Sequence, residues 1–225
     1  MIFILSFAGA AALALALRLY FVLPIFSRRQ RSTVDARKRK GKAVRNATQR
    51  MLCIVLGSGG HTAEMTRLLS GVDLDRYSRR LYIVGESDLI SLDQIGVLES
   101  KRDGEKEEYF VGRVPRSRRV GQPWLTTPMS VLRCFRQVAW LMYRHLPDAV
   151  LCNGPGNCVV VCVVATIIRV LGVKRIPIIY VESFARVKTL SLSGKIMYLL
   201  ADRFIVQWPD LLRQYPRAEH VPNLV

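Results

Sequence analysis

Apolar and polar positions fall into blocks along most of the chain, and these blocks predict a series of strands and helices. Six apolar residues at 51–56 predict a buried strand, and Met65, Leu68 and Leu69 then recur at helical spacing. Shorter apolar runs predict further strands over 81–84, 108–111, 149–152, 176–181 and 203–207. Helices are expected between them, over 128–145, 158–168 and 191–201. Strands that alternate with helices are typical of one α/β domain built on a doubly wound, parallel, Rossmann-like sheet.

Two of the predicted helices carry informative patterns. The helix over 128–145 is amphipathic and is expected to present one apolar side, formed by Leu132, Phe135, Val138, Ala139 and Met142. The helix over 158–168 is apolar nearly throughout, but it is too short to span a bilayer. Two placements therefore stay open for it, buried on the sheet or dipping partly into a membrane.

The first 26 residues form a separate apolar block, interrupted by Arg18. A helix over 1–26 would be about 39 Å long, which exceeds the roughly 30 Å thickness of a hydrocarbon core. We therefore expect a transmembrane anchor over 1–26, with Arg18 snorkelling to an interface. A cleaved signal peptide is the alternative, because the Ala-rich stretch 8–16 resembles a cleavage region. No basic residue precedes the apolar run, which favours the anchor.

The net charge is concentrated directly after this block. The chain has 34 Lys and Arg against 17 Asp and Glu, a net charge of +17, and 50% of it is hydrophobic, which excludes a disordered chain. Residues 27–50 hold ten basic residues and Asp35, so more than half of the excess charge lies in this linker. The positive-inside rule places the linker and the domain over 51–225 in the cytosol. The linker either contacts anionic lipid or is solvated, and Asn46 in a glycosylation sequon serves as a topology probe. The charge predicts no nucleic-acid partner.

Five cysteines are present, an odd number without zinc-site spacing. We expect buried, reduced thiols and therefore a reducing compartment.

A glycine-rich turn follows the first strand. Gly57, Gly59 and Gly60 surround Ser58, and His61 and Thr62 open the next helix. Glycines and a helix N-terminus suit a phosphate. The turn is not a P-loop, and Thr62 occupies the position of the last glycine in a dinucleotide fingerprint. Glu86, at the end of the second strand, can still mimic the ribose-binding acid, so NAD binding stays open, as does a turn without ligand.

Two more turns follow predicted strands, at the edge where ligands of parallel sheets bind. The polar turn over 153–157 consists of Asn153, Gly154, Pro155, Gly156 and Asn157, and it either contacts a ligand or only reverses the chain. Glu182 follows the strand that ends at Val181; it is either a general base or a cap for the next element.

The remaining candidates are a histidine and a basic loop. His61 is the only histidine in a glycine turn, and it either acts as a general base or has a phosphate-binding or structural role. The loop over 113–119 is rich in arginine. Arg116 and Arg118 in this loop either grip a diphosphate or a lipid head group or are solvated.

Several motifs together resemble one known family. They are LGSGGHTAEM at 56–65, PRSRRVGQ at 115–122, NGPG at 153–156 and YVESFAR at 180–186, behind an N-terminal anchor. The combination resembles the membrane-anchor subunit of the UDP-N-acetylglucosamine transferase of asparagine-linked glycosylation, the asparagine-linked-glycosylation protein fourteen family. The resemblance covers residues 51–225. The glycine turn also looks like that of bacterial lipid-linked GlcNAc transferases with the two-domain GT-B fold. This resemblance implies neither a metal ion nor a cofactor, and no Asp-x-Asp motif appears in the predicted turns.

The resemblance implies that the domain is the acceptor-side half of a split GT-B glycosyltransferase, inactive alone. A soluble subunit would supply most of the UDP-GlcNAc site. The pair would add the second N-acetylglucosamine, in β1,4 linkage, to GlcNAc-diphosphate-dolichol on the cytosolic face of the endoplasmic reticulum, including the contiguous nuclear envelope. The C-terminal tail of the family is implicated in binding the partner, which points to Val221, Pro222, Asn223, Leu224 and Val225.

The implied reaction inverts the anomeric centre, so a base must deprotonate the acceptor hydroxyl. His61 is the first candidate and Glu182 the second. Phosphates would lie near the glycine turn, and the resemblance extends the set of substrate-binding candidates to Gly57, Ser58, Gly59, Gly60, Thr62, Glu64, Arg116, Arg118, Asn153, Gly154, Pro155, Gly156 and Ser183. Pro123 stands where the family is expected to have serine, which weakens the transfer to the basic loop. A non-catalytic membrane scaffold and a membrane-bound NAD-dependent reductase are the alternative functions.

Overall fold

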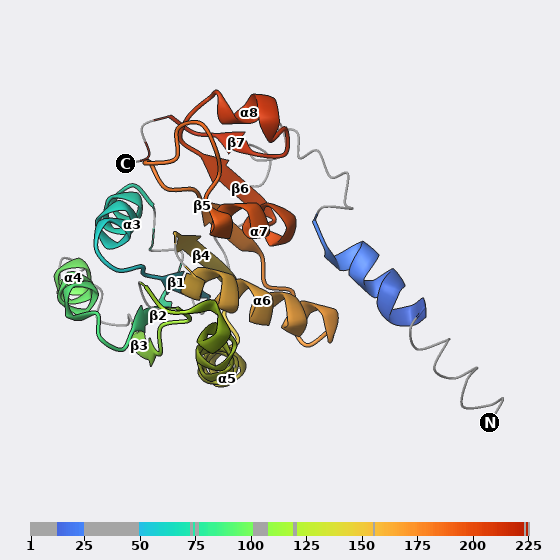
Figure 1. The fold of residues 1–225 in the computed structure, drawn as a ribbon. Coiled ribbons are helices and arrows are strands. Elements are labelled where there is room, and N and C mark those ends of the chain that lie inside the picture. The colour runs from blue at the N-terminus through green and yellow to red at the C-terminus, as the bar shows by residue number, and fades with distance from the viewer. Residues whose placement is uncertain are drawn as a thin grey trace, which may run out of the picture.

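The computed structural model describes residues 13–24, 50–72, 74, 77–100, 108–118, 121–154, 156–222 and 224. Along the chain they form strands and helices in near-regular alternation (Figure 1). The order is β1 (Met51–Val55), α3 (Gly60–Ser70), β2 (Arg79–Gly85), α4 (Leu89–Ser100), β3 (Glu108–Val114), η3 (Trp124–Thr126), α5 (Thr127–His145), β4 (Ala149–Asn153), α6 (Gly156–Val170), β5 (Ile178–Val181), α7 (Leu192–Leu200), β6 (Arg203–Val206), α8 (Leu211–Gln214) and β7 (Glu219–His220).

The described strands make one seven-stranded sheet in the order β3-β2-β1-β4-β5-β6-β7. All neighbouring pairs are parallel. In the register of the central pairs, Cys53 of β1 lies beside Leu81 of β2 and Val150 of β4. The strand order therefore reverses direction between β1 and β4, as in doubly wound folds. The predicted fold class, an α/β domain with a parallel sheet, is confirmed at this level.

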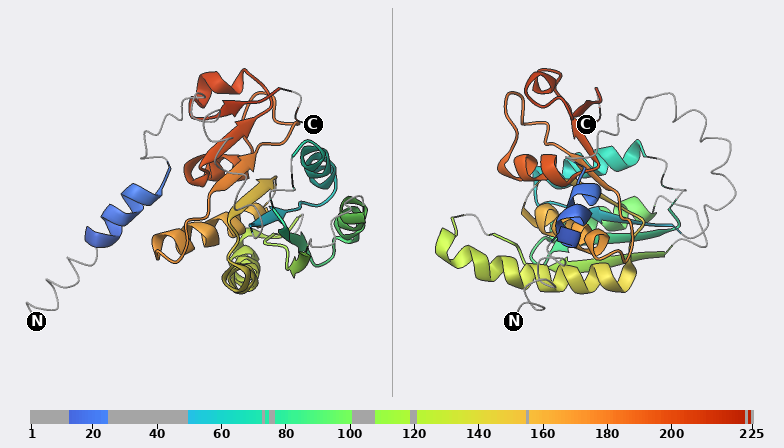
Figure 2. Two further views of the ribbon diagram at one scale, coloured as in Figure 1. Left: turned by 180° about the vertical axis from the view of Figure 1, so that it is seen from behind. Right: turned by 90° about the vertical axis from the view of Figure 1, so that its right-hand side faces the viewer.

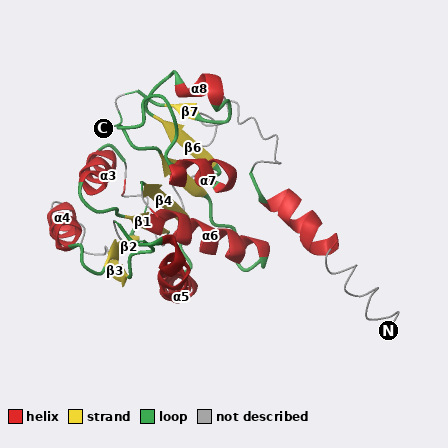
Figure 3. Ribbon diagram, in the orientation of Figure 1, coloured by secondary structure: helices red, strands yellow, loops and turns green. Residues whose placement is uncertain are grey.

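Alternate residues of each strand pack against different helix layers, because successive side chains of a strand point to opposite faces. Met51, Cys53 and Val55 of β1 join the core under α5, α6 and α7. Leu52 and Ile54 join the core under α3 and α4. The two layers lie on opposite sides of the sheet (Figures 1 and 3). The near-continuous apolar runs of the sequence arise because both faces of the sheet are covered.

Helix α6 settles one alternative that the sequence left open. Most of its apolar residues are buried between the sheet and its neighbouring helices, with contacts to α5 and α7. The helix lies on the sheet, so the prediction that it is buried there is confirmed. All five cysteines are free and buried, as expected.

Some elements differ from the sequence prediction. Helix α4 was not predicted, because its apolar residues are spread around the helix with no single face, and only Ser91 and Ile95 are buried. The short elements η3, α8 and β7 were also missed. Helix α5 spans the predicted range, but it buries Cys134, Val138, Leu141 and Met142. Leu132 was expected on the buried side and is 60% exposed, so that assignment was wrong.

The predicted anchor over 1–26 and the basic linker over 27–50 lie largely outside the described residues. Residues 13–22 form a helix. Among the residues that the structure describes, no helix combines the length and the hydropathy that a bilayer span requires. The anchor therefore stays a prediction.

Candidate functional site

The carboxyl ends of β1 and β4 lie at the point where the strand order reverses. The chain leaves β1 into α3 on one face of the sheet and leaves β4 into α6 on the other. In open α/β sheets this arrangement opens a crevice beyond the strand ends, where ligands bind. The glycine turn at 57–60 and the polar turn at 153–156 flank it.

The glycine turn is held in shape from inside. Gly59 has φ of 65°, in the left-handed region that favours glycine. The Thr62 hydroxyl donates a hydrogen bond to the Gly57 carbonyl oxygen, and the Ser91 hydroxyl donates to the same oxygen at 3.2 Å. Thr62 is buried, so its hydroxyl is used within the turn, while Ser58, Gly59 and Gly60 are exposed. The exposed backbone at the start of α3 is thus the part of this turn that is available to a ligand.

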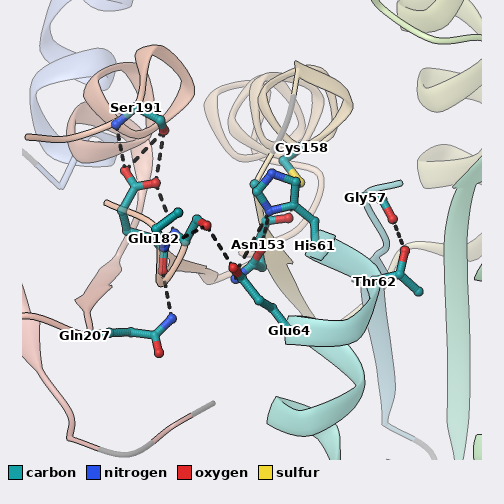
Figure 4. Close-up of polar contacts among 12 residues, drawn as sticks. Gly57, His61, Thr62, Glu64, Asn153, Cys158, Glu182, Ser191 and Gln207 are labelled. Atoms are coloured by element: carbon teal, nitrogen blue, oxygen red, sulfur yellow. Dashed lines mark hydrogen bonds and ion pairs between the residues drawn. The ribbon is translucent and has the colours of Figure 1, made fainter. Parts of the chain in front are cut away.

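Four predicted site residues from three segments meet in one hydrogen-bonded chain (Figure 4). The Asn153 amide nitrogen donates to Glu64 Oε2 at 2.8 Å, and the Ser183 hydroxyl donates to Glu64 Oε1 at 2.8 Å. His61 Nδ1 lies 3.0 Å from Asn153 Oδ1 and 3.8 Å from Glu64 Oε2. Helix α3 supplies His61 and Glu64, β4 supplies Asn153, and the loop after β5 supplies Ser183. These hydrogen-bonded side chains therefore span the point where the strand order reverses.

The hydrogen-bond partners of His61 determine its tautomer. An ionised carboxylate only accepts hydrogen bonds, so Asn153 must turn its amide nitrogen to Glu64. Its oxygen then faces His61, and Nδ1 of the neutral ring must carry the proton to donate to it. The lone pair of the neutral imidazole is therefore on Nε2. Since 31% of the His61 side chain is exposed, this fixed ring is partly open at the sheet edge.

The lack of a side chain at Gly154 leaves space for the His61 imidazole. Its φ is 94°, and a Cβ at this position would lie 2.5 Å from His61 Nδ1. The buried Tyr180 hydroxyl donates to the Gly154 carbonyl oxygen at 3.3 Å and restrains the turn. The glycine is required both by the backbone conformation and by the close approach of the ring.

Glu182 is enclosed, in contrast to His61. Its carboxylate accepts hydrogen bonds from the backbone N–H of Ser183 and from the backbone N–H and hydroxyl of Ser191, the N-cap of α7. The Gln207 side chain donates to the Glu182 carbonyl oxygen at 3.1 Å. Burial raises the pKa of the Glu182 carboxyl above its ordinary value of 4.5, and these hydrogen bonds act in the opposite direction. Figure 4 shows the carboxylate directed toward Ser191, away from His61.

The basic loop connects to the site through its serine. The Ser117 backbone N–H donates to Asn157 Oδ1 at 2.8 Å, which ties the loop to the first turn of α6. Gly156 is needed there, because a Cβ would lie 2.5 Å from the Ser117 hydroxyl. Arg116 lies along Gly85 at the end of β2, and Arg118 is exposed and donates to the Gln122 carbonyl oxygen at 3.2 Å. The loop borders the same sheet edge as the two turns.

The C-terminal tail lies against the domain. The Val221 N–H donates to the Val206 carbonyl oxygen at 3.3 Å. Val221 and Leu224 pack partly against the core on the α3 side, and Pro222 is exposed. Asn223, Val225 and Pro155 lie outside the described residues.

Sequence reasoning missed two supporting residues. Ser191 binds Glu182 and caps α7, and a serine directly before an apolar helical run was the available signal. Gln207 gave no signal, because its partner is distant in the chain. Asn157 was expected in the polar turn, but its bond to the Ser117 N–H of the basic loop was not. Within the described ranges, no three His, Cys, Asp or Glu side chains gather as metal ligands.

Comparison with known proteins identifies relatives of this protein. Residues 52–224 match the family described as "Oligosaccharide biosynthesis protein Alg14 like". The Rattus norvegicus "UDP-N-acetylglucosamine transferase subunit ALG14" is 47% identical over 179 residues, 77% of this chain and 82% of the rat protein. The Homo sapiens protein of that name is 39% identical over 223 residues, 97% of this chain and 95% of the human protein. Acinetobacter baumannii MurG, a solved structure, has a TM-score of 0.49 and 14% identity, covering 72% of this chain and 42% of its own.

Proposed function

Because the chain belongs to the Alg14-like family of oligosaccharide biosynthesis proteins, we propose that it is the membrane-anchored, acceptor-side subunit of a two-chain UDP-N-acetylglucosamine transferase. The observation that carries the proposal is the 39% identity, over 97% of this chain, to a protein named as a subunit of that transferase. A subunit implies a further chain, and we take this to be a soluble protein that binds most of the UDP-GlcNAc. The reaction proposed is β1,4 transfer of the second N-acetylglucosamine to GlcNAc-diphosphate-dolichol.

The location follows from the N-terminal sequence. The apolar block over 1–26 anchors the chain in the endoplasmic reticulum membrane, and the basic linker over 27–50 keeps the domain on the cytosolic side. A lipid-linked acceptor needs its enzyme at the membrane surface, which supports an anchored subunit on the acceptor side. In this proposal the domain is one half of a split GT-B enzyme, and the tail at 221–225 contacts the soluble half.

At the site, we assign His61 as the base. Transfer with inversion needs a base that removes the proton of the acceptor hydroxyl as its oxygen attacks C1 and UDP departs. His61 offers Nε2 on a ring whose other nitrogen is held by Asn153. Glu182 remains the second candidate, but its enclosure by Ser183 and Ser191 favours a role in shaping the loop before α7. The exposed turn at 58–60 would offset phosphate charge through backbone N–H groups.

Reconstitution tests the proposal. Transfer of labelled GlcNAc from UDP-GlcNAc to a GlcNAc-diphosphate-lipid is measured with this chain, with the soluble subunit and with both. Activity in the mixture alone supports the split enzyme. No activity in a mixture that forms the complex would overturn it. Glycosylation of Asn46 in cells would place the linker in the lumen and refute the topology.

Variants separate a catalytic subunit from a non-catalytic scaffold. His61→Gln and Glu182→Gln are compared in complexes purified to equal stoichiometry. A large loss of kcat in His61→Gln with an intact complex supports the base. Full activity in both variants would favour the scaffold. A chain without residues 221–225 is expected to lose the soluble subunit on co-purification, while its Tm shows whether the domain stays folded.

A further inference from the structure

Helix α5 has two apolar faces, and only one of them is buried. Cys134, Val138, Leu141 and Met142 pack into the core. On the opposite side, Met129, Leu132, Trp140 and Tyr143 are exposed at successive spacings of three, eight and three residues, with Arg136 midway between Leu132 and Trp140. Leu125, in the short helix η3 just before α5, is 95% exposed. We call Leu125, Met129, Leu132, Trp140 and Tyr143 the α5 outer stripe.

The stripe lies on an outer side of the domain. In both views of Figure 2, α5 lies at the lower edge of the domain, and the right view shows its full length along that edge. Exposed apolar residues that gather on one surface mark a contact with a partner or a membrane.

The charged residues in the segment that contains the stripe are basic. Residues 109–147 contain seven arginines and neither Asp nor Glu. Arg133, Arg136 and Arg144 are exposed on α5 itself, and Arg113 lies beside the helix, because Gln137 donates to its carbonyl oxygen at 2.6 Å. The guanidinium of Arg144 lies 5.7 Å from the centre of the Trp140 ring. Apolar and aromatic side chains flanked by arginines are the composition of helices that lie in the plane of an anionic membrane surface.

We propose that the α5 outer stripe rests on the head-group region of an anionic lipid bilayer. This contact goes beyond the N-terminal anchor, because it involves the folded domain and fixes its orientation. A protein partner would be expected to match the arginines with acidic residues, whereas an anionic bilayer supplies both the negative charge and the apolar layer that Trp140, Tyr143 and Leu125 require.

The contact would bring the lipid surface next to the crevice. The N-terminal end of α5 is tied to the site, because the Ser130 hydroxyl donates to the Ser117 carbonyl oxygen at 2.8 Å and Ser117 is bonded to Asn157. A bilayer on α5 would therefore meet the sheet edge where the two turns lie. A lipid-linked diphosphate could then reach the crevice with its polyprenol still in the membrane.

The test places a fluorescent reporter on each helix layer. The full-length chain carries Tyr143→Cys on α5 or, as the matched control, Val97→Cys, an exposed position on α4 across the sheet. The five native cysteines are buried, so the dye reacts with the introduced one. Each labelled chain is reconstituted into phosphatidylcholine vesicles with or without phosphatidylserine, and quenching by brominated acyl chains is measured.

The dye at position 143 is expected to shift its emission to shorter wavelength and to be quenched when phosphatidylserine is present, while the dye at 97 does neither. Each arginine near an anionic surface strengthens binding about fivefold, so Arg133→Gln with Arg136→Gln should lower the ratio of docked to undocked domain by up to about 25-fold. Arg67→Gln on α3 is the control and should leave the ratio unchanged. All these substitutions are at exposed positions, and circular dichroism checks the fold.

Two results would overturn the proposal. One is equal quenching at positions 143 and 97. The other is a response at 143 that appears only when the soluble subunit is added, which would make the stripe a protein interface. The measurement needs no transferase activity, so its failure leaves the proposed function untouched, and a failed reconstitution of activity leaves this measurement interpretable.

Discussion

Replacing Glu64 by glutamine should slow the transferase about tenfold while leaving its KM nearly unchanged. A glutamine at this position can keep both hydrogen bonds, because its oxygen accepts from Asn153 and its amide donates to the Ser183 hydroxyl. The Asn153 oxygen still faces His61, and the tautomer is kept. Only the negative charge is lost. That charge matters most when His61 has taken the acceptor proton and become an imidazolium.

The distance sets the size of the effect. His61 Nδ1 and Glu64 Oε2 are 3.8 Å apart. At that distance two charges attract by about 1 kcal/mol in water and by about 4 kcal/mol at an effective dielectric constant near 20. Since the His61 side chain is 31% exposed, the lower part of this range applies, about 1–2 kcal/mol, which corresponds to a 5- to 30-fold loss of kcat. Glu64→Ala also frees the Asn153 amide, at a further cost of about 1–3 kcal/mol, so its loss should be larger.

A double-mutant cycle tests whether Glu64 acts through His61. kcat and KM are measured for wild type, Glu64→Gln, His61→Gln and the double variant, each as the purified two-chain complex. If Glu64 acts through His61, the glutamine at 64 has little effect once His61 is gone. The reasoning fails if Glu64→Gln lowers kcat as much in the His61→Gln background as in wild type, or if it changes KM alone.

Three stability predictions follow from other contacts. Gly154→Ala should lower the free energy of unfolding by about 2 kcal/mol, because φ is 94° and the new Cβ meets the His61 ring; an unchanged urea midpoint would contradict this. Asp202→Ala should cost about 3 kcal/mol in the same assay, because Asp202 pairs at 2.6 Å with Nη1 of the buried Arg169, whose Nε and Nη2 have no hydrogen-bond partner among the described residues. A loss below about 1 kcal/mol would exclude an uncompensated charge. Burial raises the pKa of the Glu182 carboxyl above 4.5, so in the folded state this carboxyl keeps its proton to a higher pH than in the unfolded chain. The free energy of unfolding therefore falls as the pH rises from about 4.5 through the raised pKa. The Tm of wild type minus that of Glu182→Gln should therefore shrink from acidic to neutral pH, and a constant difference would refute the argument.

The parallel sheet was predictable because its central strands are buried on both faces and so appear as short apolar runs between turns. Helix α4 was not, since a helix that buries little more than Ser91 and Ile95 leaves no apolar periodicity. The exposed position of Leu132 was also missed, because α5 has apolar residues on two sides and the pattern does not say which side meets the core.

The two site turns were predictable from glycines at strand ends, but the roles of single side chains were not. Glu64 and Asn153 are 89 positions apart in the chain, and only the adjacency of β1 and β4 brings them together. Likewise the sequence left Glu182 as either a general base or a cap for the next element, and the groups that enclose it come from Ser183 and from Ser191, the N-cap of α7. Burial and partner choice of polar residues depend on the tertiary fold.

The position of β1 in the middle of the sheet also has a consequence for the order of folding. As the chain leaves the ribosome, β1 can pair with β2 once residue 85 has emerged, but its other edge stays open until β4 arrives, nearly one hundred residues after β1 begins. Such distant pairings form slowly, because a long loop must close before they form. Ser183, the last member of the hydrogen-bonded chain at the crevice, emerges later still. The nascent protein therefore exposes an unpaired apolar strand edge during much of its synthesis, and it completes its site only after most of the domain has been made.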